Sequence, residues 1–350
     1  MNASSRPGKR AQRSDRIEPG RLLHLVDLIA GRRVAVVGDL IADEFIYGEI
    51  ARVSREAPVL ILNYDSTEVV PGGAGNAAGN VAALGGQARI AGLVGRDEAG
   101  TRLLETLMRR RVDARNVVRP GRYTTPRKTR ILAGGIHSAK QQVVRIDRGA
   151  TIEITDAVRK TFRARVLRAV RGADALILSD YGTGLITPSL VADARSSVRT
   201  IVVDSRYNLL AFQGITACTP NESEVEQALG MRIADNGAAL ERAGRTLLRR
   251  TNASAVLITR GSRGMALFEP KQPTLHIPIV GSDQIADVTG AGDTVIATLT
   301  LALSAGASFA EAAHLANHAG GVVVMKRGTA TVSASELRYA ISGGTIGRPA

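Results

Sequence analysis

Short apolar runs alternate with longer alanine-rich or amphipathic segments along most of the chain. Each run is too short for a helix and rich in β-branched residues, so it predicts a buried strand. The strands predicted in this way cover residues 34–38, 88–94, 175–179, 200–204, 215–219 and 254–259. Two alanine-rich stretches, 291–303 and 309–325, predict long helices. This alternation predicts an α/β fold with a doubly wound, mostly parallel sheet flanked by helices.

Two regions interrupt the alternation. The β-prone pieces 45–48, 58–62 and 68–70 follow one another with no helix between them. A second pair, 128–133 and 141–146, flanks a glycine-containing turn. The first three pieces predict a small antiparallel sheet or lid, and the second pair would complete or extend it. Together, residues 45–70 and 128–146 form a small β lid as an appendage to the main sheet.

The beginning of the chain differs in composition from the rest. Residues 1–20 carry several arginines and a lysine among Ser, Pro and Gly, which predicts a disordered basic tail. A length of 350 residues fits one large α/β domain better than two equal ones. We therefore expect residues 21–345 to form a single domain.

The composition, 44% hydrophobic and 22% charged, is typical of a globular protein. The chain has one cysteine, Cys218, so no intrachain disulfide can form. The first residues contain no apolar signal core, and no run approaches the roughly 18 apolar residues of a membrane span. These features predict a cytoplasmic protein with no membrane partner.

The formal net charge of +14 favours contact with anions such as nucleic acid, an anionic membrane surface or phosphorylated small molecules. No basic run is interleaved with aromatic residues, as single-strand binders require. We therefore attribute the net charge to arginines that are spread over solvated helix faces. Nucleic-acid binding, on a scaffold that has lost another activity, stays as the hypothesis from a second functional class.

The glycine-rich segment 287–294 comes directly before the helical residues 295–303. Backbone amides of Gly290, Ala291 and Gly292 can point at a phosphoryl group, and the helix dipole adds positive potential there. Asp293 would be repelled by such an anion unless it has a task, for example to accept a proton from an attacking hydroxyl. The alternative is an aspartate that only caps the helix.

A second glycine-rich helix start occurs at residues 71–76. Asn76 can hydrogen-bond sugar hydroxyls there, although a plain tight turn or a dinucleotide-binding loop has a similar composition. A dinucleotide loop should follow the first strand instead of a series of lid strands. Asp39 comes directly after the first strand, where parallel sheets form their ligand-binding sites, so it is a further candidate for a site residue.

Four motifs now occur in order: Gly72 to Asn76, Asn221 to Glu224, Thr259 to Gly261, and Asp287 to Asp293. In this order they resemble the ribokinase-like (PfkB) carbohydrate kinases, over residues 30–340. Within that family the chain is most similar to the kinase domain of the bacterial heptose enzymes. The runs that carry this similarity are 36–39, 54–59, 178–182, 287–295 and 320–324.

The resemblance implies an ATP-dependent kinase that phosphorylates the anomeric hydroxyl of D-glycero-β-D-manno-heptose 7-phosphate, in the ADP-heptose pathway of lipopolysaccharide core synthesis. The nucleotidyltransferase half of those enzymes, with its His-x-Gly-His signature, has no counterpart in this sequence, which implies a kinase-only form. The alternative is another sugar kinase of the same fold, with ribose, fructose 6-phosphate or a nucleoside as the acceptor. The resemblance also implies a homodimer that pairs through the lid.

Carried over to this sequence, the resemblance assigns Asp293 as the base and Gly290, Ala291 and Gly292 as the anion hole. The other implied roles are sugar binding by Asp39, Gly72, Gly73 and Asn76, Mg²⁺ binding through water by Asn221 and Glu224, nucleotide binding by Thr259, Gly261 and Asn317, and a monovalent cation such as K⁺ near Asp287.

The sequence departs from the heptose kinase pattern at several positions. Thr183 replaces a lysine after 180–182, Ser205 and Arg206 replace a Pro-Lys pair, and the lid turn 133–140 is longer. These differences put the contacts to the substrate phosphate in doubt. Arg130 and Arg145 are candidates for binding that phosphate, because guanidinium groups bind phosphate in a fixed fork. The alternative is that both are solvated surface arginines.

Overall fold

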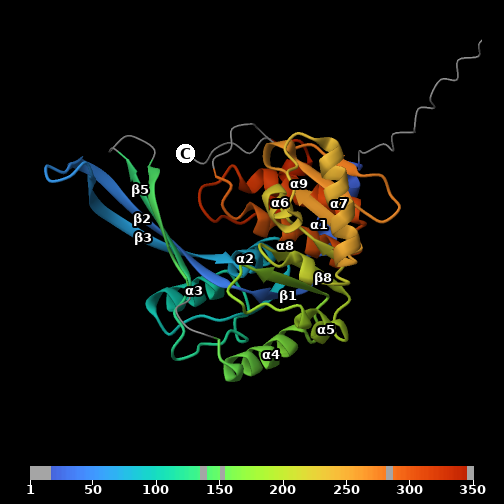
Figure 1. Ribbon diagram of the computed structural model, residues 1–350, viewed down its shortest axis with the longest axis horizontal. Coiled ribbons are helices and arrows are strands. Elements are labelled where there is room, and N and C mark those ends of the chain that lie inside the picture. Colours follow the sequence, from blue (N-terminus) through green and yellow to red (C-terminus); the bar gives the residue numbers. More distant parts are fainter. Residues whose placement is uncertain (1–16, 135–139, 150–153, 281–286, 345–350) are drawn as a thin grey trace, which may run out of the picture.

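The computed structural model describes residues 17–134, 140–149, 154–280 and 287–344. Two sheets dominate the fold, and the smaller one stands away from the main body as a long, curved arm (Figure 1). The main sheet has eight strands in the order β12-β11-β10-β9-β8-β7-β1-β4. The strands from β4 to β10 are parallel, and β11 and β12 are antiparallel additions at one edge.

The predicted buried strands are all present in the main sheet. Their bounds differ from the prediction by a few residues, most at β9, where only two residues pair. The eight strands are β1 Arg33–Gly38, β4 Gln87–Ala91, β7 Ala175–Asp180, β8 Thr200–Ser205, β9 Ala217–Cys218, β10 Ala255–Thr259, β11 Met265–Phe268 and β12 Leu275–Ile277.

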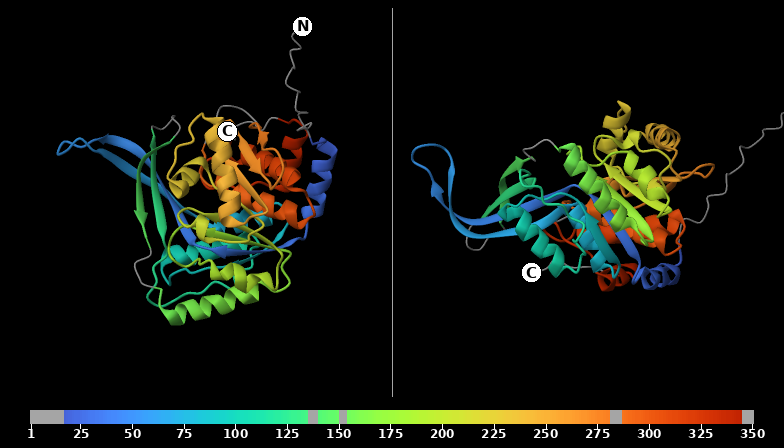
Figure 2. Two further views of the ribbon diagram at one scale, coloured as in Figure 1. Left: turned by 45° about the vertical axis from the view of Figure 1, so that its right-hand side comes forward. Right: turned by 90° about the horizontal axis from the view of Figure 1, so that it is seen from below.

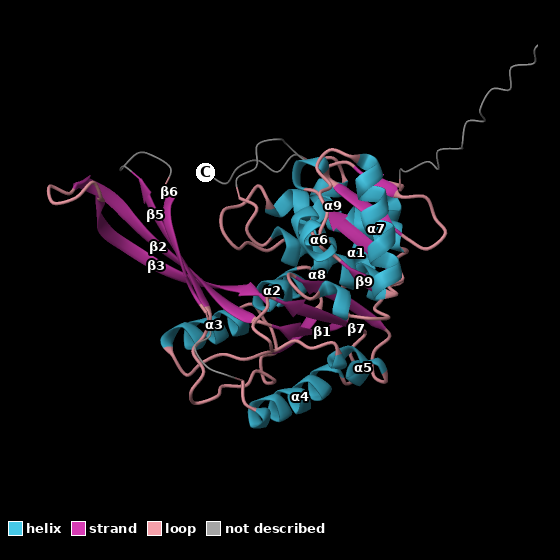
Figure 3. Cartoon of the chain, in the orientation of Figure 1, coloured by secondary structure: helices cyan, strands magenta, loops and turns pink. Residues whose placement is uncertain are grey.

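Helices cover both faces of this sheet, as Figure 3 shows. Side chains alternate along each strand, so in β1 Val34 and Val36 pack into one apolar core and Ala35 and Val37 into the other. The first core contains α1 Pro19–Ile29, α2 Ala74–Ala83, α3 Glu98–Arg109, α8 Ala291–Ser304, α9 Phe309–Val323 and α10 Ala334–Ile341. The second contains α4 Asp156–Val170, α5 Ser189–Arg195, α6 Glu222–Leu229 and α7 Gly237–Thr251.

The predicted lid is present, and it is larger than predicted. Residues 45–70 lie in an antiparallel pair of strands, as expected, and the complete lid is a mixed sheet. Its order is β3-β2-β5-β6, with β2 and β5 parallel. The three predicted pieces at 45–70 belong to two 14-residue strands, which separate from the body in both views of Figure 2. The strands are β2 Leu40–Val53, β3 Leu60–Gly73, β5 Arg127–Gly134 and β6 Gln141–Arg148.

The chain enters and leaves the lid at the carboxyl edge of the main sheet. β2 begins two residues after β1 ends, and β3 runs directly into α2. The backbone of Asp39 joins these segments, because its N–H donates to Ser179 O (3.0 Å) and its carbonyl accepts from Ala74 N (3.1 Å). The base of the lid is therefore fixed where parallel sheets place their sites.

Both chain ends of the domain pack against the first core. Helix α1 begins at Pro19, inside the range predicted as the basic tail, while residues 1–16 of that range and 135–139 of the lid turn lie outside the described residues. Among the described helices, none combines the length and the apolar character that a membrane crossing requires.

Candidate active site

A cavity of about 300 Å³ lies between the base of the lid and the carboxyl edge of the main sheet. It contains polar and charged side chains from the lid, from the loops after β7 and β8, and from the start of α8. The lining residues are Ile41, Asp43, Gly73, Lys128, Arg130, Arg145, Tyr181, Asp204, Arg206, Thr219, Asn221, Glu224, Thr259, Val288, Thr289, Gly290, Gly292 and Asp293.

Asp293 lies in the first turn of α8, and its side chain does not cap the helix. The N-cap is Gly290, at φ +80°, with no side-chain cap bond. A Cβ at Gly290 would lie 2.5 Å from Nδ2 of Asn76, so only glycine fits this turn. The helix start has no side-chain cap, and the N–H of Ala291 donates to Val288 O at 3.2 Å. Backbone amides at such an uncapped helix start are the groups that can bind an anion.

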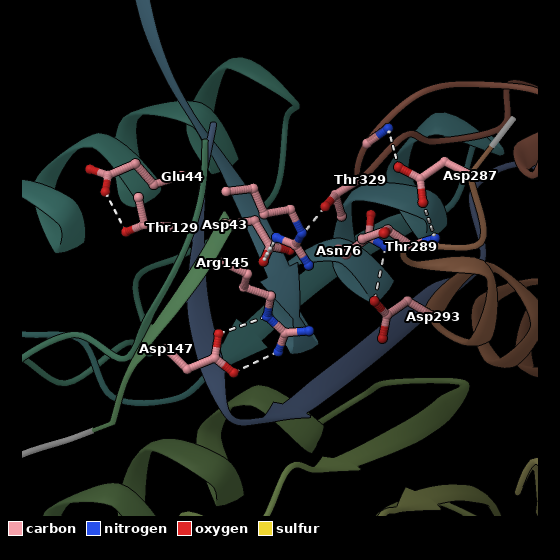
Figure 4. Close-up of polar contacts among 12 residues, drawn as sticks. Asp43, Glu44, Asn76, Thr129, Arg145, Asp147, Asp287, Thr289, Asp293 and Thr329 are labelled. Carbon is pink, nitrogen blue, oxygen red and sulfur yellow. Dashed lines mark hydrogen bonds and ion pairs between the residues drawn. The ribbon is translucent and has the colours of Figure 1, made fainter. Parts of the chain in front are cut away.

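The Asp293 carboxylate is almost fully buried and is held from two sides. Asn76 Nδ2 donates to one oxygen at 2.9 Å, and the Tyr181 hydroxyl donates to the other at 2.9 Å. Figure 4 shows the Asn76 contact. Burial raises the pKa of Asp293 to about 6, although both hydrogen bonds act in the opposite direction. A carboxylate with this pKa is ionised at neutral pH and is a stronger base than an exposed one.

Tyr181 was not predicted as a site residue. It follows β7 directly, and its backbone N–H donates to Asp39 Oδ2 at 2.7 Å. Asp39 also accepts from the backbone and hydroxyl of Thr183. Asp39 is itself buried, which raises its pKa to about 6. The position of Tyr181 at the carboxyl end of a parallel strand is the signal that could have identified it.

Of the four residues assigned to sugar binding, only Gly73 lines the cavity. Asn76 and Asp39 are buried behind the wall and hold Asp293 and Tyr181 instead. Gly72 packs against Asp43, since a Cβ there would lie 2.4 Å from its Oδ2. Direct sugar contacts by Asp39, Gly72 and Asn76 stay predictions.

Asn221 and Glu224 line the cavity and form the capping box of α6. Asn221 Oδ1 accepts from Glu224 N at 2.9 Å, and Glu224 Oε2 accepts from Asn221 N at 2.9 Å. Burial raises the pKa of both Glu224 and Asp204, and mutual repulsion adds to the rise at Asp204. A bound cation would relieve this crowding.

The donor set around these two carboxylates fits Mg²⁺ bound largely through water and substrate phosphates. Thr219 Oγ1 is buried with no hydrogen-bond partner among the described residues, and Thr219 lines the same cavity. No group of three or more His, Cys, Asp or Glu suited to a metal occurs in the described part of the chain. Mg²⁺ commonly keeps several waters and uses only one or two carboxylates, so this set is sufficient.

The residues assigned to the nucleotide are only partly brought together. Thr259 lines the cavity, and it forms a parallel bridge with Asn221. Gly261 and Asn317 do not line it, and the amide of Asn317 donates to Pro278 O at 2.7 Å. Their contact with a nucleotide stays a prediction.

Asp287 connects two loops beside the start of α8. Its carboxylate accepts from Thr289 N at 2.8 Å and from Gly328 N at 3.0 Å (Figure 4). Its own N–H donates to Val324 O at 3.1 Å. Asp287 thereby fixes the loop that leads into the glycine-rich turn.

The two arginines assigned to a distal phosphate line the cavity, but each already holds a carboxylate. Arg130 is buried and pairs with Asp43 at 2.7 Å. Asp43 also accepts from Thr329 Oγ1 at 2.9 Å. Arg145 forms two bonds to Asp147, at 2.7 and 2.6 Å (Figure 4). The cavity residues Asp43, Lys128, Asp204 and Arg206 were not predicted.

Comparison with known proteins identifies the family and the fold. The family model described as pfkB family carbohydrate kinase matches residues 32–336. The chain is 42% identical over 311 residues to the bifunctional protein HldE of Geobacter metallireducens, with 86% of this chain aligned. The alignment spans 61% of that relative, so the chain covers less than two thirds of its length.

Solved structures share the fold at low sequence identity. Ribokinase of Arabidopsis thaliana, complexed with ribose and ATP, matches with a TM-score of 0.69 and 21% identity, over 89% of this chain and 99% of that one. Phosphofructokinase-2 of Escherichia coli, in complex with potassium, matches with a TM-score of 0.71 and 19% identity, over the same shares.

The buried pair of Asp43 and Arg130 yields a stability prediction. The Asp43→Ala substitution leaves the Arg130 guanidinium buried without its partner, and Thr329 loses its acceptor. We expect the free energy of unfolding to fall by about 3–5 kcal/mol, the cost of an uncompensated buried charge. Urea denaturation followed by circular dichroism measures this change.

The matched control is Asp147→Ala, which breaks the more exposed pair with Arg145 on the same lid. That loss should cost no more than about 1 kcal/mol. Equal effects of the two substitutions would show that Asp43 does not stabilise Arg130 in the folded protein.

Proposed function

Because the chain belongs to the pfkB family of carbohydrate kinases and is therefore an ATP-dependent phosphotransferase, we propose that it phosphorylates the anomeric hydroxyl of D-glycero-β-D-manno-heptose 7-phosphate. The similarity to HldE supports this acceptor. The observation that carries the proposed chemistry is the buried Asp293 carboxylate beside the uncapped start of α8.

In the proposed reaction the acceptor hydroxyl lies at Asp293. The carboxylate accepts the hydroxyl proton while the oxygen forms a bond to the γ-phosphorus of ATP. The bond from that phosphorus to the bridging oxygen breaks, and ADP leaves with the electron pair. Amides of Gly290, Ala291 and Gly292 would stabilise the charge on the phosphoryl oxygens during the transfer.

Asn221 and Glu224 would hold Mg²⁺ through water, with Asp204 and Thr219 nearby in the cavity. The metal neutralises phosphate charge when it is bound. The nucleotide would extend past Thr259 toward Gly261 and Asn317. A monovalent cation beside Asp287 is part of the proposal, supported by the potassium complex of the phosphofructokinase-2 structure.

The test is ADP release with Mg-ATP and a panel of acceptors: the heptose 7-phosphate, ribose, fructose 6-phosphate and adenosine. We expect turnover on the heptose phosphate to exceed that on the others. The Asp293→Asn variant should bind ATP but lose turnover by about 10²- to 10⁴-fold, the range for a lost general base.

Preferred turnover on another acceptor would overturn the heptose assignment and keep the mechanism. Near-normal turnover in Asp293→Asn would show that Asp293 is not the base. ATP binding by the variant, measured by calorimetry, controls for loss of folding.

The raised pKa of Asp293 predicts an acid limb in kcat/KM. Protonation below about pH 6 removes the base, so the rate should fall about tenfold per unit as the pH decreases further. Tyr181→Phe removes a donor that stabilises the carboxylate, so the limb should move to higher pH by roughly half to one unit.

Phosphate groups of the substrates also titrate near pH 6, with pKa values of about 6. Comparison of wild type and Tyr181→Phe with the same substrates isolates the enzyme group, because the substrate contribution is identical in both profiles. An unchanged limb in Tyr181→Phe would refute the assignment to Asp293.

We also propose that the chain forms a homodimer through the lid. Apolar side chains stay exposed on the lid strands: Ile50, Val53, Leu60, Tyr64, Val143, Val144 and Ile146. Every residue of β6 is exposed. An exposed apolar surface of this kind favours association with another surface.

The variant Val144→Glu/Ile146→Glu places two charges on this surface. We expect multi-angle light scattering to show the mass of two chains for wild type and of one chain for the variant. Leu167→Glu on α4 is the control and should stay dimeric. A single-chain mass for wild type would contradict the dimer.

A further inference from the structure

Asn80 is a fully buried polar side chain on α2, and it does not line the cavity. Its Nδ2 donates to the backbone oxygen of Asn76, one turn earlier on the same helix, at 3.1 Å, and to Oδ1 of the Asn76 side chain at 3.3 Å. Its Oδ1 accepts from Thr294 Oγ1 at 3.2 Å and from Val332 N at 3.1 Å. We propose that Asn80 is a positioning residue, which fixes the orientation of the Asn76 amide and, through that amide, holds the carboxylate of Asp293.

The direction of these hydrogen bonds is set by backbone groups at both ends of the chain of amides. An asparagine amide can be turned over, which exchanges its oxygen and its NH₂ group, whereas a backbone N–H only donates and a carbonyl only accepts. The N–H of Val332 requires the oxygen of Asn80 on its side, so the NH₂ group of Asn80 faces Asn76. At the other end, the carbonyl of Gly290 accepts from Asn76 Nδ2 at 3.3 Å. Both ends therefore select the same orientation of the two amides.

The last hydrogen bond of this chain reaches the proposed base. Asn76 Nδ2 donates to Asp293 Oδ2 at 2.9 Å, as Figure 4 shows. If the Asn76 amide were turned over, its oxygen would face the carboxylate, and two acceptors with no proton between them repel each other. Asn80 opposes that orientation, because its NH₂ group would then face the NH₂ group of Asn76. A residue outside the cavity wall thus helps to decide whether Asp293 faces a donor.

This inference rests on the proposed role of Asp293 as the base and adds a residue that serves it. Loss of the Asn80 donor leaves the Asn76 amide without the Asn80 contact that orients its oxygen. The hydrogen bond from Asn76 to the ionised carboxylate should then weaken, and the pKa of Asp293 should rise. In the wild type, burial is the largest influence and raises this pKa, while the Asn76 hydrogen bond acts to lower it.

Other groups also act on the pKa of Asp293, and they are the same in every Asn80 variant. The hydroxyl of Tyr181 donates to Asp293 and lowers the pKa. The charge of Asp43 raises it, and the charge of Arg206 lowers it. Asp204 and Asp293 repel each other. Because these side chains are retained when Asn80 is substituted, a change in the pKa reports the Asn76 amide.

The first measurement follows the Asp293 carboxyl group directly and requires no turnover. Carbon NMR of protein labelled at its aspartate carboxyl carbons gives the titration of each group, and the Asp293→Asn variant identifies the signal of Asp293. Asn80→Ala removes both polar groups of the side chain. In Asn80→Ser the hydroxyl can still bond the backbone carbonyl of Asn76 but is too short to reach its amide. We expect the pKa of Asp293 to rise by roughly half a unit in both variants.

The matched control is Asn116→Ala. Asn116 is also a buried asparagine, in the loop between α3 and β5, and it does not line the cavity. Its substitution removes a buried amide outside the site and should leave the pKa of Asp293 at the wild-type value. Midpoints of urea unfolding report whether each variant folds, and Asn80→Ser decides the test if Asn80→Ala does not. A pKa equal to wild type in Asn80→Ser would overturn the inference.

A double-mutant cycle tests whether Asn80 acts through Asn76. Asn76→Ala removes a donor to Asp293, so the pKa of Asp293 should rise in this variant as well. Adding Asn80→Ser to Asn76→Ala should change the pKa no further, because the amide that Asn80 orients is absent. A further rise as large as that in Asn80→Ser alone would show that Asn80 acts by another route, and the inference would fail.

Kinetics separate this inference from the proposed function. With an acceptor that is turned over, the acid limb of kcat/KM should move in Asn80→Ser by the same amount as the NMR titration, while KM for ATP stays the same. If the pKa from NMR moves and the acid limb does not, Asp293 is not the base, and its positioning by Asn80 stands. If wild type phosphorylates none of the acceptors, the proposed function fails, and the titration still decides the role of Asn80.

Discussion

The site depends on the two hydrogen bonds that hold the buried carboxylate of Asp293. Burial of a charge is unfavourable unless donors compensate for it, and here the donors come from two distant segments. Asn76 belongs to the helix that follows the lid, and Tyr181 to the loop after β7. Burial raises the pKa of Asp293 to about 6, and the hydrogen bonds from these two segments keep the pKa from rising further. The fold and the base are therefore coupled through two hydrogen bonds.

The lid is connected to the same region through Asp43. This side chain joins Arg130 on β5 to Thr329, and the methyl carbon of Thr329 lies 3.3 Å from the position of a Cβ on Gly290. Gly328 binds the carboxylate of Asp287. A displacement at the base of the lid would thus be transmitted through packed atoms to the loop that carries the anion hole. We infer that the lid and the glycine-rich turn are positioned together.

The sequence predicts the main sheet well because its strands are buried on both faces. Runs such as 34–38 and 175–179 are apolar throughout, and little except a central strand fits them. The lid strands were harder to predict, because they are partly exposed, carry polar residues and contain register shifts near Gly48 and Arg52. Period-two patterns are disrupted at such bulges. Isolated pieces were therefore predicted where two continuous strands occur.

Local sequence was enough to single out Gly290 and Asp293, which line the cavity from one helix start, and their roles stay predictions. It was missed where the role depends on a partner far away in the sequence. Tyr181 lies 112 residues from Asp293, and no local pattern marks that pairing. The same holds for the arginines of the cavity. Residue type alone does not distinguish Arg130, which pairs with a carboxylate, from Arg206, for which no carboxylate partner occurs in the described part of the chain.

The charges of the cavity are arranged so that one ligand can alter the strength of the base. Burial is the largest influence on the pKa of Asp293 and raises it, whereas the charge of Arg206 acts to lower it. A phosphate bound at Arg206 would offset that positive charge, and the pKa of Asp293 would rise further. The carboxylate would then attract the hydroxyl proton more strongly when the phosphate is in place than before it arrives. Arg206 therefore holds the pKa of Asp293 lower as long as no bound anion offsets its charge.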